Sequence, residues 1–174
     1  MYDMTTPYNS MTDLFPALLQ ELYSGETQLI DALPRMAARA SSRKLQDALF
    51  EHLTATEQHA LRLEQALTQL HCTTLGKPCT AIAAMVAEGE AIVAAEGDPD
   101  VIDAALAGAA QRVEQFEIAA YATVAEMAYL LGRQEISTLL RKTLDEERLA
   151  DGKLSEIVML DINPRAFVWH ASSR

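Results

Sequence analysis

Four glutamates of this chain occupy positions at which the surrounding amphipathic pattern requires an apolar side chain: Glu26, Glu57, Glu117 and Glu147. Burying an unpaired charge is costly, so a protein interior keeps such residues only where something compensates their charge. Glu114 precedes one of them by three residues and Asp151 follows another by four, so both acids share the faces of their neighbours. The six carboxylates are therefore candidate ligands of a metal centre.

The spacing of these acids places them at one depth. Residues equidistant from the turn of an antiparallel helical hairpin lie side by side. Glu26 lies 15 residues before a turn at residue 41 and Glu57 lies 16 after it, while Glu117 and Glu147 each lie 15 from Gly132. With a rise of about 1.5 Å per residue, both pairs are expected about 22 Å from their turns.

Six carboxylates at one level would repel one another and raise one another's pKa values. Two divalent cations would cancel most of this charge, and oxygen-rich ligation favours iron or manganese over zinc or copper. The pattern thus predicts a centre of the di-iron or di-manganese type. The alternative is that each acid lies at the edge of its apolar face and reaches water.

Two tyrosines and two histidines lie near the predicted centre. Tyr23 and Tyr121 each fall one turn from one of the glutamates and could hydrogen-bond a ligand, although packing in the core is the commoner role. His52 and His59 lie seven residues apart on one face, but neither forms a Glu-x-x-His pair with Glu57. We expect both histidines to be packing or surface residues.

Helical periodicity and capping signals divide the chain into long amphipathic segments. Thr12 is the candidate cap of the first helix, and Ser41 and Ser42 separate it from the second. Asp98 precedes Pro99, a typical helix start, and Gly132 is a typical helix end. The pattern predicts helices over about 12–40, 42–70, 81–96, 99–131 and 134–159.

Four long helices, two tight hairpins and one long crossover are typical of an all-α, ferritin-like four-helix bundle. The segment 81–96 is then a short extra helix in the crossover between the second and third long helices. The alternative is a plain up-down bundle with an additional helix. We expect a disordered leader at 1–11, the bundle at 12–159 and a C-terminal tail at 160–174.

Length and composition exclude several classes of function. With 174 residues the chain is expected to form one domain, and its net charge of −11 argues against nucleic acid as a partner. It has no apolar run of the roughly 18–20 residues that a membrane span requires and no signal-peptide pattern, which indicates a cytoplasmic protein. Cys72 and Cys79 are expected to be free thiols, with a disulfide between them as the alternative.

Several segments resemble one known family. LFPALLQELYSGETQLIDALPRMAARASS, EHLTATEQHALRLEQ, DAALAGAAQRVEQFEIAAYATVAEMAYLLG and TLDEERLADGKL are similar, in this order, to the YciE/YciF group of ferritin-like bacterial stress proteins. The resemblance covers about 12–158. It implies a ferritin-like bundle, a homodimer and a role in stress responses.

The resemblance also implies a ligand set. Rubrerythrins and bacterioferritins, which share this bundle, use one Glu on each of two helices and a Glu-x-x-His on the other two. By this resemblance Glu26 matches the first-helix ligand, Glu114 with Glu117 resembles the paired acids of the rubrerythrin third helix, and Glu147 matches the fourth-helix Glu. Two positions depart from the pattern, since Thr54 stands in place of an acid and Ala150 in place of a histidine.

Two functions are consistent with these features. The first is a metal-binding stress protein that oxidises Fe(II) or consumes peroxide, with O₂ or peroxide as its small-molecule substrate. The second is a non-enzymatic dimeric bundle whose metal site is vestigial, and it is favoured by the departures at Thr54 and Ala150.

Overall fold

The computed structural model describes residues 8–169, so most of the expected leader and the last five residues of the expected tail lie outside the description. The helices are α1 (Met11–Arg39), α2 (Arg43–Gln69), α3 (Thr80–Val93), α4 (Pro99–Leu130), α5 (Gln134–Ile157), a π-helical turn η1 (Val158–Ile162) and α6 (Asn163–Trp169). The described residues contain no β-strand. The predicted all-α bundle with a short extra helix in its crossover is confirmed.

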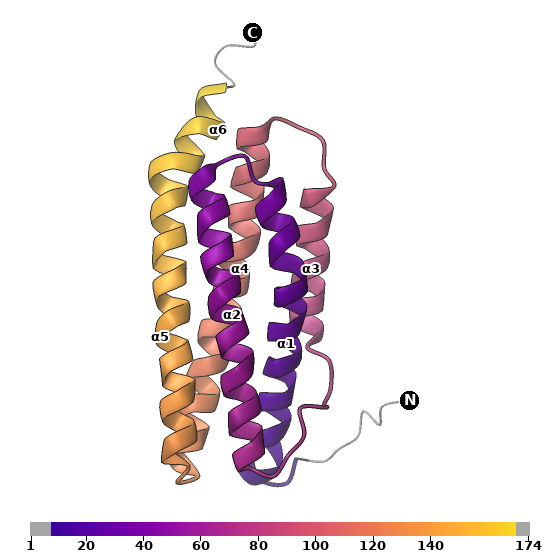
Figure 1. Ribbon diagram of the computed structural model, residues 1–174, viewed down its shortest axis with the longest axis vertical. Helices are drawn as coiled ribbons and strands as arrows, with labels where there is room; N and C mark the ends of the chain where they lie inside the picture. Colours follow the sequence, from indigo (N-terminus) through magenta and orange to yellow (C-terminus); the bar gives the residue numbers. More distant parts are fainter. Residues whose placement is uncertain (1–7, 170–174) are drawn as a thin grey trace.

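The four long helices pack as two hairpins, α1 with α2 and α4 with α5 (Figure 1). The crossover that contains α3 returns the chain along the outside of α1 to the end of the bundle where α2 begins. As a consequence, α2 and α4 run in the same direction. Among residues 8–169 no helix combines the length and the apolar character that a membrane crossing requires.

Local capping accounts for the helix boundaries. The first helix begins at Met11, because the Ser10 hydroxyl accepts a hydrogen bond from the Asp13 N–H at 3.1 Å, so the predicted cap at Thr12 is wrong. Asp98 caps α4 as predicted and accepts from the Asp100 N–H at 2.9 Å. Gly132 adopts a φ of 71°, which an L side chain disfavours, at the turn between α4 and α5.

The C-terminal end of the bundle differs from the expected tail. The last long helix does not stop near residue 159 but continues through η1 into α6. Ile162, in η1, is buried against the hydrophobic core. The expected division at residue 159 therefore falls inside a continuous helical segment.

The apolar core consists of two clusters separated by a polar layer. One cluster fills the end of the bundle near the α1–α2 turn and contains Leu33, Leu45 and Leu106. The other fills the opposite end and contains Leu19 and Leu140. Because apolar packing holds the helices together on both sides of the middle, the side chains of the polar layer are held in fixed positions.

One buried acid outside this layer has a structural role. Asp103, on α4 and 1% exposed, accepts hydrogen bonds from the Ser41 N–H at 2.8 Å, the Ser41 hydroxyl at 2.6 Å and the Ser42 N–H at 2.7 Å. It thereby fixes the α1–α2 turn against the start of α4.

Replacing Asp103 with alanine is expected to lower the free energy of unfolding by about 2–4 kcal/mol, because the buried Ser42 N–H and the part-buried Ser41 N–H both lose their acceptor. Urea unfolding followed by circular dichroism measures this loss. Asp47→Ala, which removes an exposed ion pair with Arg43, is the control and should change the same free energy by less than about 1 kcal/mol. Equal losses in the two variants would contradict the role assigned to Asp103.

Candidate metal centre

The polar layer consists of four glutamates and two histidines, each at most 7% exposed. They come from all four long helices: Glu26 from α1, His52 and His59 from α2, Glu114 and Glu117 from α4, and Glu147 from α5. The layer lies halfway along the bundle, where the hairpin spacing predicted the acids. It contains the ligand types that iron and manganese prefer.

These side chains form two groups whose potential ligand atoms lie within 4.8 Å of one another. The first group is Glu26, His59 and Glu147, and the second is His52, Glu114, Glu117 and Glu147. Glu147 belongs to both. Its Oε1 lies 2.8 Å from Nδ1 of His59, and its Oε2 lies 3.9 Å from Nδ1 of His52. One carboxylate therefore lies between two potential ion positions.

Many polar atoms of this layer have no hydrogen-bond partner. Across residues 8–169, eight buried side-chain oxygen and nitrogen atoms have no hydrogen-bond partner, and all eight belong to these six side chains. Buried polar groups in native proteins nearly always have a hydrogen-bond partner. Eight unpaired atoms in one place therefore require an explanation. Cation binding by this layer would explain the unpaired atoms, and the carboxylates and imidazoles present are suitable ligands for divalent metal ions.

The contact between His59 and Glu147 supports this reading. The two atoms are 2.8 Å apart, yet neither has a well-aligned hydrogen-bond partner. Atoms that bind one ion at about 2.1 Å and at right angles lie about 3 Å from each other. This spacing fits two ligands of one cation, and in the absence of a cation it fits an ion pair between the two side chains.

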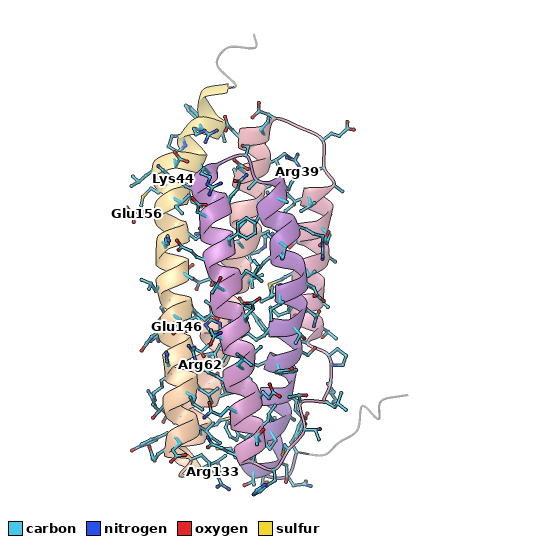
Figure 2. The ribbon with its side chains drawn as sticks, viewed as in Figure 1. Arg39, Lys44, Arg62, Arg133, Glu146 and Glu156 are labelled. Atoms are coloured by element: carbon cyan, nitrogen blue, oxygen red, sulfur yellow. The ribbon has the colours of Figure 1, made fainter. Side chains whose placement is uncertain are left out.

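Two residues outside the polar layer, Glu146 and Arg62, orient His59. Its Nε2 lies 3.0 Å from Oε2 of Glu146, and Arg62 donates two hydrogen bonds to the same carboxylate, at 2.5 Å and 3.0 Å. Figure 2 shows Arg62 and Glu146 together between α2 and α5. When His59 is neutral, this contact assigns the proton to Nε2 and leaves Nδ1 free to face Glu26 and Glu147. Histidine ligands are commonly held in this way by a carboxylate.

Tyr121 plays a comparable part for Glu26. Its buried hydroxyl donates a hydrogen bond to Oε1 of Glu26, which leaves Oε2 of the same carboxylate free. The ring also packs edge-on against His59. Of the two tyrosines named from the sequence, Tyr121 thus contacts the centre directly, whereas Tyr23 is a half-buried residue packed against the hydrophobic core.

Burial and mutual repulsion set the protonation of the acids. Burial raises the pKa of Glu26 to about 8, and burial together with the charge of Glu147 raises the pKa of Glu114 to about 10. Burial also raises the pKa of Glu117 well above its ordinary value. Without cations the centre is therefore neutralised in part by protons, which a metal ion would have to displace.

The pair His59 and Glu147 carries opposite charges instead. Burial alone would raise the pKa of Glu147, but the closeness of His59 outweighs it and lowers that pKa. Burial likewise opposes the charged form of His59, yet the approach of Glu147 gives His59 a raised pKa. For His52, burial dominates and lowers the pKa, which favours the neutral form that binds metals.

Four of the six acids named from the sequence lie together in the layer: Glu26, Glu114, Glu117 and Glu147. The placement predicted for Glu57 is wrong, because its side chain is exposed. Counting residues from the turn gives the height along a helix but not the face. The inward positions at this height of α2 are His52, Thr56 and His59, and Glu57 is rotated by about 100° from Thr56.

Asp151 also lies outside both groups. It is half-buried and faces a surface hollow that Gln111 and Arg112 line. Its charge still contributes to the raised pKa of Glu114. Asp151 therefore influences the centre from a distance rather than lying within it.

The expectation that His52 and His59 are packing or surface residues missed their place in the polar layer, where both are buried. Both are inward on α2, one in each group. The signal was present, since they continue the heptad-like series Leu45, Leu49, His52, Thr56, His59 and Leu63. Thr54, by contrast, is exposed and bonds only to the Phe50 carbonyl at 3.2 Å. The two α2 histidines thus bring ring nitrogens into the layer, although Thr54 and Ala150 depart from the ligand pattern of the related bundles.

Replacing Glu146 with alanine is expected to weaken metal binding about 10- to 100-fold without unfolding the chain, because His59 loses the carboxylate that fixes its orientation. Isothermal titration with manganese measures the change. Asp145→Ala removes the exposed acid next to it on α5 and should bind manganese as the unmodified chain does. An unchanged affinity for manganese in Glu146→Ala would contradict the role of Glu146 in orienting His59.

The chain shares this fold and much of its sequence with known proteins. It is 34% identical over 158 residues to protein YciF of Escherichia coli K12, and the match covers 90% of this chain and 95% of YciF. The crystal structure of that stress protein has a TM-score of 0.85 to this chain, with 89% of this chain and 98% of the other covered.

Two further solved structures are similar. YcfI of Rhodopseudomonas palustris is 34% identical, with a TM-score of 0.83 over 88% of this chain and 98% of its own. A protein from Xanthomonas campestris is 18% identical with a TM-score of 0.69, over 90% of this chain and 99% of its own, which shows the shared fold alone. The resemblance to the YciE/YciF group is confirmed.

A family model matches residues 10–166, which include every residue of the polar layer. The chain therefore belongs to the family described as a domain of unknown function, DUF892.

Proposed function

We propose that this protein is a metal-binding stress-response protein whose polar layer binds two divalent ions, of iron or manganese. The observation that carries the proposal is the set of eight unpaired buried atoms, all on six side chains from four helices. A purely structural layer would be expected to pair these atoms with one another or to replace them with apolar groups.

Charge supports a pair of ions rather than one. The ionised carboxylates of the layer carry four negative charges, and two divalent cations carry four positive ones. The two groups that share Glu147 provide a separate position for each ion, with one histidine in each group. Hard divalent ions suit a set of ligands in which oxygen outnumbers nitrogen.

Two adjacent ions of this kind supply electron exchange with dioxygen or peroxide, so oxidation of Fe(II) or consumption of peroxide is the proposed reaction class. The chain itself contributes positioning. Glu146 holds the proton of His59 on Nε2, and Tyr121 orients the Glu26 carboxylate. The two apolar clusters exclude water from above and below the layer. Glu26, Glu117 and Glu147, buried between the two clusters, would therefore face a bound ion rather than solvent.

The stress-response part of the proposal comes from the relative. YciF of Escherichia coli is a stress protein, and 98% of its solved chain is covered by the match with this one. A protective role against iron or peroxide would suit such a response. We propose the same protective role for this chain.

Metal analysis tests the proposal. The chain is produced in iron- or manganese-supplemented medium, and its metal content is measured together with its Fe(II) oxidation and peroxide consumption. About two ions per chain and activity above that of free ions are expected. Fewer than roughly 0.2 ions per chain after reconstitution would contradict the proposal.

A second candidate is a homodimer that acts by binding a partner. The specific observation in its favour is a set of exposed apolar side chains at the C-terminal end of the bundle, since Met159, Leu160 and Phe167 are 65%, 67% and 81% exposed. Exposed apolar patches commonly mark interaction sites. Light scattering should give a mass near twice 19.1 kDa if two copies associate, and a mass near 19.1 kDa would exclude the dimer.

A further inference from the structure

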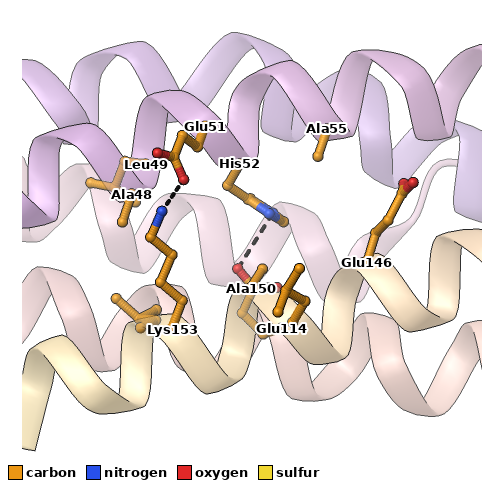
Figure 3. Close-up of a pocket in the computed structure, with 11 residues that line it drawn as sticks. Ala48, Leu49, Glu51, His52, Ala55, Glu114, Glu146, Ala150 and Lys153 are labelled. Carbon is orange, nitrogen blue, oxygen red and sulfur yellow. Dashed lines mark hydrogen bonds and ion pairs between the residues drawn. The ribbon is translucent and has the colours of Figure 1, made fainter.

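A cavity of about 440 Å³ opens between α2 and α5 and leads to one side of the polar layer (Figure 3). Its walls are small or aliphatic side chains, among them Ala48 and Ala55 on α2 and Leu149 and Ala150 on α5. Ala150 stands where the family resemblance implied a histidine, and its small side chain leaves this space open. The cavity falls within the size range of small-molecule sites.

The inner end of the cavity is polar and unpaired. His52 and Glu114 line it, and they are 7% and 3% exposed. Both ring nitrogens of His52 and Oε2 of Glu114 lack hydrogen-bond partners. Figure 3 shows the His52 ring pointing across the cavity towards Glu114, with 3.4 Å between Nε2 and Oε1. An apolar space thus ends at buried polar atoms that have no hydrogen-bond partner.

The charges around the cavity select an uncharged ligand. At one end of the opening Lys153 is paired with Glu51, and at the other Glu146 is engaged with Arg62 (Figures 2 and 3). No described cation that lines the cavity is therefore left free for an anion, and the carboxylates of the polar layer would repel one. A neutral O–H group, which can both donate and accept, pairs with the polar atoms at the inner end without introducing charge.

The geometry points to a binding site for an uncharged organic molecule with an apolar body and one O–H group, such as an aryl alcohol or an organic hydroperoxide. The apolar body lies against the alanines and leucines, and the O–H group donates to His52 or Glu114. An apolar cavity of about 150 Å³ already accepts benzene, so an aromatic ring with a short polar arm fits this space. That the ligand is a substrate rests on the proposed function, whereas the binding site itself does not require metal.

Calorimetric titration with benzyl alcohol tests this site. It is done on the full chain as purified and again after metal removal, with toluene and benzoate as comparison ligands. We expect saturable binding of benzyl alcohol after metal removal, when no ion occupies His52 and Glu114, with a Kd about tenfold or more higher for benzoate because of its charge, and higher for toluene because it lacks the O–H group.

The variant Ala55→Phe fills the cavity and should raise the Kd for benzyl alcohol by about tenfold or more. Ala119→Phe places the same side chain on the exposed face of α4 and is the matched control, with the Kd unchanged within about twofold. If circular dichroism shows that Ala55→Phe does not fold, Ala150→Leu, from the opposite wall, replaces it.

Three results would overturn the inference: the absence of saturable benzyl alcohol binding, equal affinity in Ala55→Phe and Ala119→Phe, or a change of oligomeric state in Ala55→Phe that reveals a second copy of the chain over the opening. Metal content is measured on the same samples. Binding of benzyl alcohol without metal uptake would refute the proposed function alone, and metal uptake without binding would refute the cavity alone.

Discussion

Replacing Glu147 with alanine is expected to abolish the binding of both metal ions at once. Its two oxygens face different groups, one towards His59 and the other towards His52, so each ion position loses a ligand. The variant also removes the carboxylate nearest to His59. The metal content after reconstitution with manganese should fall from about two ions per chain to below about 0.2, as measured by elemental analysis.

The exposed glutamate Glu57 provides the control for this experiment. It lies on α2 at the same height as the centre but outside both groups. Glu57→Ala should bind as much manganese as the unmodified chain. Loss of metal in Glu57→Ala, or full metal content in Glu147→Ala, would be incompatible with the centre described above.

The metal-free protein is expected to lose stability as the pH rises from about 7 to about 9. Glu26 and Glu114 have folded-state pKa values of about 8 and about 10, against 4.5 in the unfolded chain. The folded state therefore holds protons that the unfolded state has released. The stabilisation by these protons is fully present below the pKa of the unfolded chain and is lost as the pH rises through the folded-state pKa values. Each retained proton lowers the free energy of unfolding by up to about 1.4 kcal/mol per pH unit.

The other members of the layer do not reverse this trend. His59 has a raised pKa and contributes in the same direction, while His52 is neutral in both states above about pH 7. Glu147 has a lowered pKa and is ionised in both states.

Urea unfolding at a series of pH values, with and without manganese, measures the effect. Bound cations should remove the loss, because they replace the protons. Glu26→Gln should reduce it in the metal-free chain, whereas Glu135→Gln, which changes an exposed acid at the start of α5, should not. A metal-free chain whose free energy of unfolding rises over this range would refute the assigned protonation.

The helices and the depth of the centre were predictable because both depend on short-range rules. Caps such as Asp98 fix a helix start within the chain itself, and counting from Gly132 gives the height of Glu117 and Glu147. The error at Glu57 shows the limit of this reasoning. Which face of α2 points inward is decided by packing against three other helices, and the acid nearest the right height lies on the wrong face.

The histidines were misjudged for a related reason. A histidine within a series of leucines is more often a packed core residue than a ligand, and the sequence of α2 contains no Glu-x-x-His pair. The pair of Glu146 and Arg62 was not predictable either, because its partners are 84 residues apart and meet only when α2 and α5 pack together. The cavity beside Ala150 depends on the same packing.

Anomalous diffraction from crystals of this protein grown with manganese shows directly whether the polar layer binds two ions. Two anomalous peaks are predicted in the middle of the bundle, on either side of the Glu147 carboxylate. One should contact Glu26 and His59 and the other His52, Glu114 and Glu117. Crystals saturated with manganese that show no peak among these six side chains, or peaks only at exposed acids, would contradict the account.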